Sequence, residues 1–70
     1  MSKDEAIEAM KQGKKVTHNY FAIDEYMTMP DKTKNTYVFE DGVIVAAEMF
    51  WADRRGVGWQ YDWHIFIETK

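Results

Sequence analysis

No cysteine occurs among the 70 residues of this chain, and its absence restricts how so short a chain can become stable. Small domains bury only about 60% of the surface that their unfolded chains expose, so they commonly depend on a disulfide, a metal, an unusually good core or a partner subunit. Disulfides, thiolate metal sites and cysteine nucleophiles are excluded here. The length predicts a single small domain, residues 1–70. Aromatic residues make up 16% of the chain, and we expect these rings either to build the core or to line a binding surface.

The clearest local signal predicts a helix near the start of the chain. Ser2 and Glu5 have the spacing of a capping box, in which each side chain accepts a hydrogen bond from the backbone N–H of the other residue. The apolar residues that follow share one helical face: Ala6, Ile7, Ala9 and Met10. Gly13 stands where a helix would end, because glycine readily takes the left-handed conformation of a helix C-terminus. We predict a helix over residues 3–12.

The middle of the chain predicts strands. Residues 15–18 and 26–29 have the pattern of short, half-buried strands. Residues 36–40 and 43–45 flank Asp41-Gly42, and this pair favours the positive φ angles of a two-residue type I′ hairpin turn. We therefore expect a β-hairpin with its turn at that pair.

The last third of the chain predicts a second short helix and a closing strand. Residues 46–55 are rich in helix-favouring types and end before a glycine. In residues 59–68, Trp63, Ile65 and Ile67 fall on one strand face, and we expect Trp63 to belong to the core. Together the segments predict an α+β fold: a mostly antiparallel sheet of about four strands, with the N-terminal helix packed on it and a second short helix.

Charge and hydropathy bear on partners and location. A net charge of −3 argues against general nucleic-acid binding, which needs several contacts to phosphate. Residues 1–5 lack the basic and then apolar pattern of a signal peptide, and no apolar run approaches the roughly 20 residues that span a bilayer. We expect a soluble, cytoplasmic domain with no membrane partner.

Residue types that carry catalysis or bind metals are sparse. His18 and His64 lie on separate predicted strands, and we expect both to be ordinary, partly exposed histidines. A metal site would need a third ligand, such as Asp24 or Asp62, and no metal-binding spacing is present. Nucleophile motifs and glycine-rich phosphate loops of the known kinds are missing as well. We therefore expect a protein that is not an enzyme and that holds no metal and no cofactor.

The most unusual stretch runs from residue 50 to residue 66, where six aromatic residues accompany the chain's only two arginines. Aromatic rings offer flat surfaces to a nucleotide base, and arginine offers a two-pronged donor to phosphate. A further aromatic cluster follows the first predicted strand and can add to such a site. The alternative is that these rings are all structural. The candidate ligand-binding residues are Tyr20, Arg54, Arg55, Trp59 and Tyr61.

Two motifs of the chain resemble a known family. Residues 5–17 read EAIEAMKQGKKVT and are similar to the helix-and-strand opening of the Thoeris anti-defence 2-like family of small phage and prophage proteins. Near the end of the chain, Asp62-Trp63 followed by Ile65 resembles the closing strand of the same family. The two motifs occur in the order that the family has.

The resemblance implies a phage-encoded inhibitor of bacterial defence. Members of the family are similar to sponges that bind signalling nucleotides of the cyclic ADP-ribose type in pockets between subunits of a homo-oligomer, and some relatives are described as anti-CRISPR proteins. Sequestration of this kind needs tight binding and no catalysis. On this hypothesis Trp59, Tyr61 or Tyr20 stacks on the base. Arg54 and Arg55 neutralise the phosphates.

Two other hypotheses stay open from the sequence. The first is a protein–protein inhibitor, whose acidic surface would occupy the basic nucleic-acid groove of a CRISPR effector or bind another host defence protein. The second is an accessory structural domain of a mobile element, with all of its aromatic residues in the core.

Overall fold

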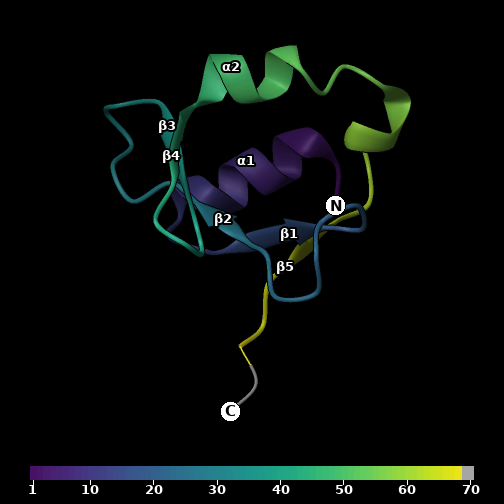
Figure 1. Ribbon diagram of the computed structural model, residues 1–70, viewed down its shortest axis with the longest axis horizontal. Coiled ribbons are helices and arrows are strands. Elements are labelled where there is room, and N and C mark those ends of the chain that lie inside the picture. The colour runs from purple at the N-terminus through teal and green to yellow at the C-terminus, as the bar shows by residue number, and fades with distance from the viewer. Residues whose placement is uncertain (69–70) are drawn as a thin grey trace.

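The computed structural model describes residues 1–68, which form two α-helices, one 3-10 helix and one sheet of five strands. In chain order the elements are α1 (Lys3–Lys11), β1 (Val16–His18), β2 (Met27–Thr28), β3 (Thr36–Phe39), β4 (Ile44–Ala46), α2 (Ala47–Ala52), the 3-10 helix η1 (Val57–Trp59) and β5 (Trp63–Ile65) (Figure 1). The predicted α+β class is confirmed, with five strands rather than about four. No helix within these residues has the length and apolar character needed to cross a membrane.

The sheet places the first and last strands of the chain side by side. Its strand order is β4-β3-β2-β1-β5, and every neighbouring pair is antiparallel. In the pair formed by β1 and β5, Val16 is opposite Ile65 and His18 is opposite Trp63. The segment that follows β1 and the segment that precedes β5 therefore meet at one end of the sheet, and the candidate site lies there.

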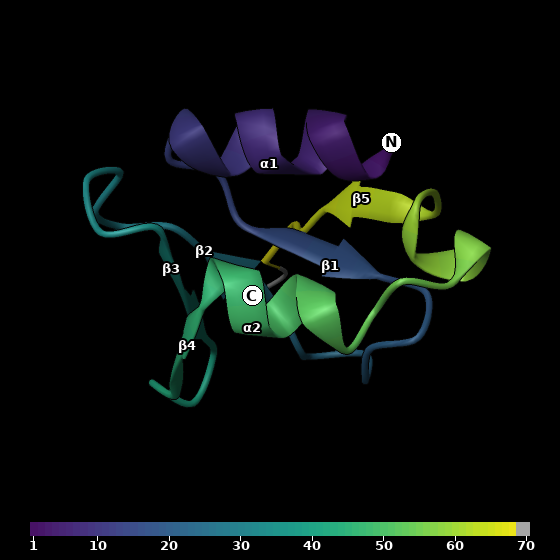
Figure 2. The same cartoon turned by 90° about the horizontal axis from the view of Figure 1, so that it is seen from above.

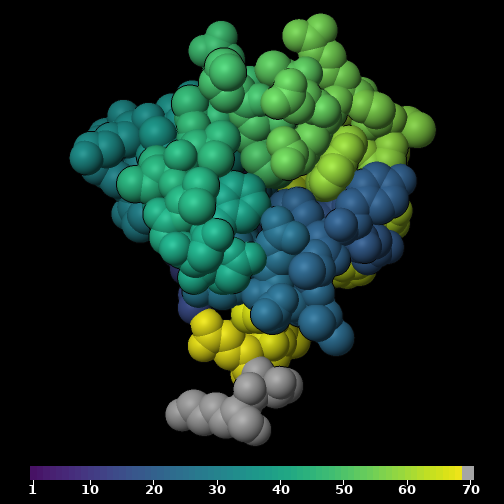
Figure 3. Space-filling view, viewed as in Figure 1, coloured from purple at the N-terminus to yellow at the C-terminus, as the bar shows by residue number. Residues whose placement is uncertain are grey.

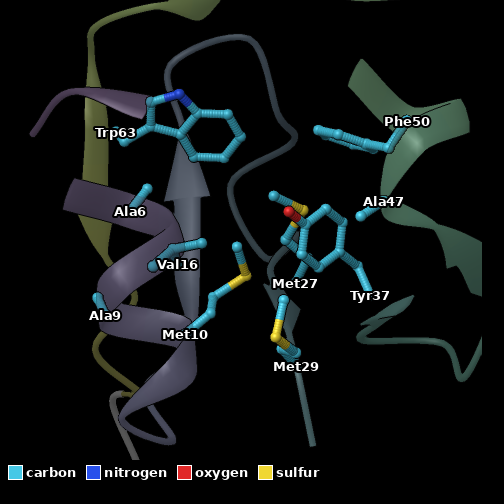
Figure 4. Packing of buried hydrophobic residues seen from close by; sticks show 10 residues of the cluster. All are labelled: Ala6, Ala9, Met10, Val16, Met27, Met29, Tyr37, Ala47, Phe50 and Trp63. Carbon is cyan, nitrogen blue, oxygen red and sulfur yellow. The ribbon is translucent and has the colours of Figure 1, made fainter. Parts of the chain in front are cut away.

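The core fills the space between the two helices and one face of the sheet (Figure 4). Its buried apolar residues are Ala6, Ala9, Met10, Val16, Met27, Met29, Tyr37, Ala47, Phe50 and Trp63. Figure 2 shows α1 running alongside β1 and β5, while α2 lies near β3 and β4. Trp63 is fully buried, as predicted, and its indole N–H donates a 2.9 Å hydrogen bond to the backbone oxygen of Trp59.

Helix α1 begins with the predicted capping box. The Ser2 hydroxyl accepts a 3.2 Å hydrogen bond from the backbone N–H of Glu5, and the Glu5 carboxylate accepts a 2.9 Å hydrogen bond from the backbone N–H of Ser2. The helix ends at Lys11, close to the predicted end. Gly13 follows with a φ of +88°, which explains why glycine stands at this position.

The hairpin of β3 and β4 is present, but the predicted two-residue type I′ turn is wrong. That turn needs positive φ at both central residues; Gly42 has a φ of +86°, whereas Asp41 does not have a positive φ. The Gly42 N–H donates to the Phe39 oxygen and the Phe39 N–H donates to the Val43 oxygen, each at 2.9 Å. The loop therefore has three residues and ends in a glycine bulge. This arrangement confines the left-handed conformation to the one residue without a Cβ atom.

The closing strand is shorter than predicted. Residues 59–68 were expected to be extended, but β5 spans only Trp63–Ile65 and Trp59 belongs to η1. Ile65 and Ile67, predicted to share the buried face of Trp63, are 39% and 77% exposed. For Ile67 the reason is the register: Val16 is opposite Ile65, so Ile67 lies beyond the end of β1 and has no opposing strand residue to pack beside. Ile65 lies on an edge strand, which has a neighbouring strand on one side alone.

Candidate functional site

The candidate site lies where the segment after β1 meets the segment after α2. In the space-filling view, atoms of the residues that follow β1 (blue) border atoms of the residues that follow α2 (green) on the right of the molecule (Figure 3). A 3.3 Å hydrogen bond from the Asn19 N–H to the Asp62 oxygen joins the two segments. We call the five predicted binding residues the aromatic–arginine face: Tyr20, Arg54, Arg55, Trp59 and Tyr61.

Trp59 lies at the centre of this face. The centroid of its ring is 5.0 Å from that of Tyr20, in a nearly edge-on arrangement, and the guanidinium carbon of Arg54 is 5.2 Å from the Trp59 ring centroid. Helix η1 positions the indole, because the backbone N–H of Trp59 donates a 3.0 Å hydrogen bond to the backbone oxygen of Gly56 and closes the turn. The structure thus brings together three of the five predicted residues.

The other two residues stand at the margin of the face. Arg55 and Tyr61 are both exposed. Within residues 1–68, the Tyr61 ring makes no aromatic contact with the Trp59 ring, and the Arg55 guanidinium makes no cation–π contact with it. Tyr20 is also 66% exposed, but its ring packs beside Trp59 and against Gly58. The structure therefore does not bring Arg55 and Tyr61 into the group that Tyr20, Arg54 and Trp59 form.

Arg54 carries a positive charge that no carboxylate neutralises within the described part of the chain, where the one ion pair joins Lys15 and Glu68. Its Nη1 donates a 3.2 Å hydrogen bond to the backbone oxygen of Phe50, and its guanidinium carbon lies 4.0 Å from the Phe50 ring centroid. Its Nε is buried and has no acceptor among those residues. Guanidinium N–H groups form strong hydrogen bonds with anionic oxygens, so Arg54 is the residue of this face suited to an anion.

His18 belongs to the site, and the prediction that it is an ordinary, partly exposed histidine is wrong. It is only 3% exposed, and its ring lies 4.4 Å from that of Trp59. Its Nδ1 accepts a 3.0 Å hydrogen bond from the backbone N–H of Tyr20. Its Nε2 lies 2.8 Å from the Gly58 oxygen and 2.7 Å from the Tyr61 oxygen. The available signal was its position two residues after Val16, which places both side chains on the same strand face.

His64 has a separate environment from His18. It is exposed, its Nε2 lies 2.7 Å from the Asn19 side-chain oxygen, and it is opposite Thr17 in the sheet. Adjacent strand positions point to opposite faces, so the two histidines do not share a site. Across residues 1–68 no three His, Asp or Glu side chains form a group that could hold a metal ion.

The face offers groups that can contact a ligand. The rings of Tyr20 and Trp59 present apolar surface, and the Arg54 guanidinium presents donors for an anion. No family model, curated protein or solved structure matches this chain. Its function is therefore inferred from the geometry of the face.

Proposed function

We propose that this chain is a non-catalytic binding protein that sequesters a small signalling nucleotide on its aromatic–arginine face. The observation that carries the proposal is Arg54, which lies 5.2 Å from the Trp59 ring and has no carboxylate partner within residues 1–68. A nucleotide joins a flat base to negatively charged phosphates. It therefore matches a ring and a guanidinium group that lie this close together.

Each side chain of the face has a role in this proposal. The exposed ring of Tyr20 stacks on the base beside Trp59, and Tyr61 adds a second exposed ring at the margin. Arg54 binds the phosphates, and Arg55 adds positive charge from the neighbouring position. All of these are binding roles, so no chemical step, metal or cofactor is assigned to the site.

The resemblance to Thoeris anti-defence 2-like proteins supports a biological role for such binding. On that basis we propose a phage-type inhibitor that removes a cyclic ADP-ribose-like signal from the cytoplasm of the host cell. Sequestration requires affinity rather than turnover. A homo-oligomer, which the same resemblance implies, would also cover apolar side chains that are exposed in the single chain, such as Ile44 and Met49.

The test is to identify what the protein retains. Purified protein is incubated with a panel of cyclic and linear nucleotides that includes ADP-ribose and cyclic ADP-ribose, washed by filtration and denatured, and the released molecules are identified by mass spectrometry. Release of an intact nucleotide only on denaturation is the expected result. A chemically altered product would show that the protein is catalytic. Retention of no nucleotide at any concentration would reject nucleotide binding.

One observation favours a second function, inhibition of a host defence protein by direct contact. Ile23, in the same segment as Tyr20, is 99% exposed, and Val57 of η1 is exposed as well. Tyrosine, tryptophan and arginine surrounded by exposed apolar side chains are typical of the energetic centres of protein interfaces. Capture of one defence complex from host lysate, lost in an I23D variant that still binds nucleotide, would favour this function over the first.

A further inference from the structure

We infer that His18 is the positioning residue of the aromatic–arginine face: one buried imidazole, in a single tautomer, holds together the two segments that carry the binding side chains. The inference rests on the proposed function for its biological meaning. Its geometry does not depend on which ligand the face takes.

The imidazole connects three backbone groups from two distant segments. Tyr20 belongs to the segment after β1, whereas Gly58 and Tyr61 belong to the segment that leads into β5. A backbone N–H can only donate, so Nδ1, which receives the Tyr20 N–H, must be the unprotonated nitrogen. Nε2 therefore carries the hydrogen and donates to the oxygens of both Gly58 and Tyr61. The opposite tautomer would lose all three hydrogen bonds.

Aromatic rings surround the imidazole, and only 3% of His18 is exposed to water. The centroid of the imidazole lies 4.4 Å from that of Trp59, 4.7 Å from that of Trp63 and 4.8 Å from that of Tyr20. In such an apolar enclosure a hydrogen bond is stronger than in water, and an unpaired carbonyl or N–H is correspondingly unfavourable. The two segments are therefore held in one arrangement as long as His18 keeps its partners.

The hydrogen-bond partners of His18 distinguish a positioning role from simple packing in the core. An apolar residue would fill the space beneath Trp59 without bonding to any backbone group. One of the three partners of His18 is the backbone N–H of Tyr20, whose ring lies beside Trp59, and another is the oxygen of Gly58, against which the Tyr20 ring packs. The third is the oxygen of Tyr61, which belongs to the segment that carries Trp59. The bonds of His18 thus fix the backbone from which the binding side chains project.

Two conservative variants separate the acceptor function of the imidazole, at Nδ1, from its donor function, at Nε2. Asparagine places its side-chain oxygen near the position of Nδ1, so H18N keeps an acceptor for the Tyr20 N–H and loses the donor to Gly58 and Tyr61. Glutamine places its amide nitrogen near the position of Nε2, so H18Q keeps that donor and loses the acceptor. H18F keeps an aromatic ring and loses both.

The first measurement is amide hydrogen exchange in the absence of ligand, together with the nitrogen NMR spectrum of the unmodified protein. We expect a single protonated ring nitrogen on His18, Nε2. Exchange of the Tyr20 amide should become at least about tenfold faster in H18Q and H18F and stay within about twofold of wild type in H18N. Exchange of the Trp59 and Gln60 amides, which close η1, should show the reverse pattern. Equal effects of H18N and H18Q on both sets, or a proton on Nδ1, would overturn the inference.

The second measurement is affinity for ADP-ribose, used as the probe. H18F should weaken binding by at least about tenfold. The matched control is V16A, a cavity-forming change on the same strand that lowers stability without touching the face; its affinity should stay within about twofold of wild type at a temperature where both variants are folded. An H18F variant that binds as tightly as V16A would overturn the inference. If wild type binds no ADP-ribose, the proposed function fails for that ligand, and amide exchange still decides the role of His18.

Discussion

The ring of Tyr20 lies so close to Gly58 that a Cβ atom on residue 58 would stand 2.9 Å from the Cε2 atom of the tyrosine. Cβ atoms in proteins essentially never approach another atom that closely. Gly58 does not have a positive φ, so space rather than backbone conformation explains the glycine. Its missing side chain lets Tyr20 lie beside Trp59, and the proposed binding face depends on this arrangement.

The first prediction concerns G58A. The added methyl group must displace the Tyr20 ring, and this ring is mostly exposed, so the free energy of unfolding should change by only about 0.5 kcal/mol. Affinity for the retained nucleotide should fall about tenfold, because the stacking surface moves away from Trp59. Calorimetric titration and chemical denaturation of the same sample measure both quantities.

The matched control for this change is G56A. A Cβ atom at Gly56 would meet nothing within 4 Å, and the residue lies just before η1 in the same segment. Its affinity should equal that of wild type. Equal affinities for G58A and wild type would show that the position of Tyr20 is unimportant for binding.

The second prediction concerns the arginines. Replacing Arg54 and Arg55 together by alanine should weaken nucleotide binding by at least about tenfold, or about 1.4 kcal/mol. Arg54 should account for most of the loss, because it alone lies over the Trp59 ring. Removing Lys32 and Lys34 instead deletes the same amount of charge from the loop between β2 and β3, on the side of the molecule away from η1 (Figure 2). If that control weakens binding equally, only general charge attraction is involved.

The parts of this fold that the sequence predicts are those with local causes. The capping box of α1 and its apolar spacing involve residues within a few positions of one another, and the helix appears where they predict it. The Asp41-Gly42 pair likewise predicts a hairpin correctly. It does not predict the turn type, because the register of β3 against β4 decides whether the loop has two or three residues.

The parts that the sequence does not predict have causes that lie far apart in the chain. His18 is buried because β5 pairs with β1 and brings Trp59, Trp63 and the Gly58 oxygen around the imidazole. No local pattern contains that pairing. The same applies to the face itself: sequence composition singled out Tyr20 and Trp59, but only the sheet order brings them together.

The third prediction concerns the capping box. S2A removes the hydroxyl that accepts the Glu5 N–H, and it should lower the free energy of unfolding by about 1 kcal/mol at neutral pH. S2T keeps a hydroxyl and should lose much less. Thermal melting of the three proteins measures the difference. An S2A variant as stable as wild type would show that the box does not contribute to stability.

The same box predicts a dependence on acid. Hydrogen bonds from the backbone and hydroxyl of Ser2 hold the pKa of Glu5 below its ordinary value of 4.5. A carboxyl group with a lowered pKa contributes stability above its unfolded-state pKa, and the contribution is lost as the pH falls through the folded-state pKa. The advantage of wild type over E5Q should therefore be present at neutral pH and disappear in acid. A constant difference from pH 2 to pH 7 would contradict this account.

The last prediction concerns Tyr37 and alkaline pH. Burial raises the pKa of Tyr37 above its ordinary value of 10.0, and the 2.9 Å hydrogen bond from the Trp51 indole N–H opposes this rise. A raised folded-state pKa means that the folded protein holds the proton more tightly. This contribution to stability is therefore complete below about pH 10 and is lost as the pH rises through the folded-state pKa. Y37F has no proton to lose, so the stability of wild type should fall toward that of Y37F at alkaline pH.

Chemical denaturation of both proteins from pH 7 to beyond pH 10 tests this prediction. At neutral pH, Y37F should be less stable by about 1 kcal/mol, because the Trp51 N–H loses its acceptor. Glu68 raises the pKa of Lys15, which titrates in the same alkaline range. Both proteins keep that pair, so it cancels in the difference between them. If the free energies of unfolding of wild type and Y37F differ by the same amount at every pH up to and beyond pH 10, Tyr37 ionises equally easily in the folded and unfolded chains.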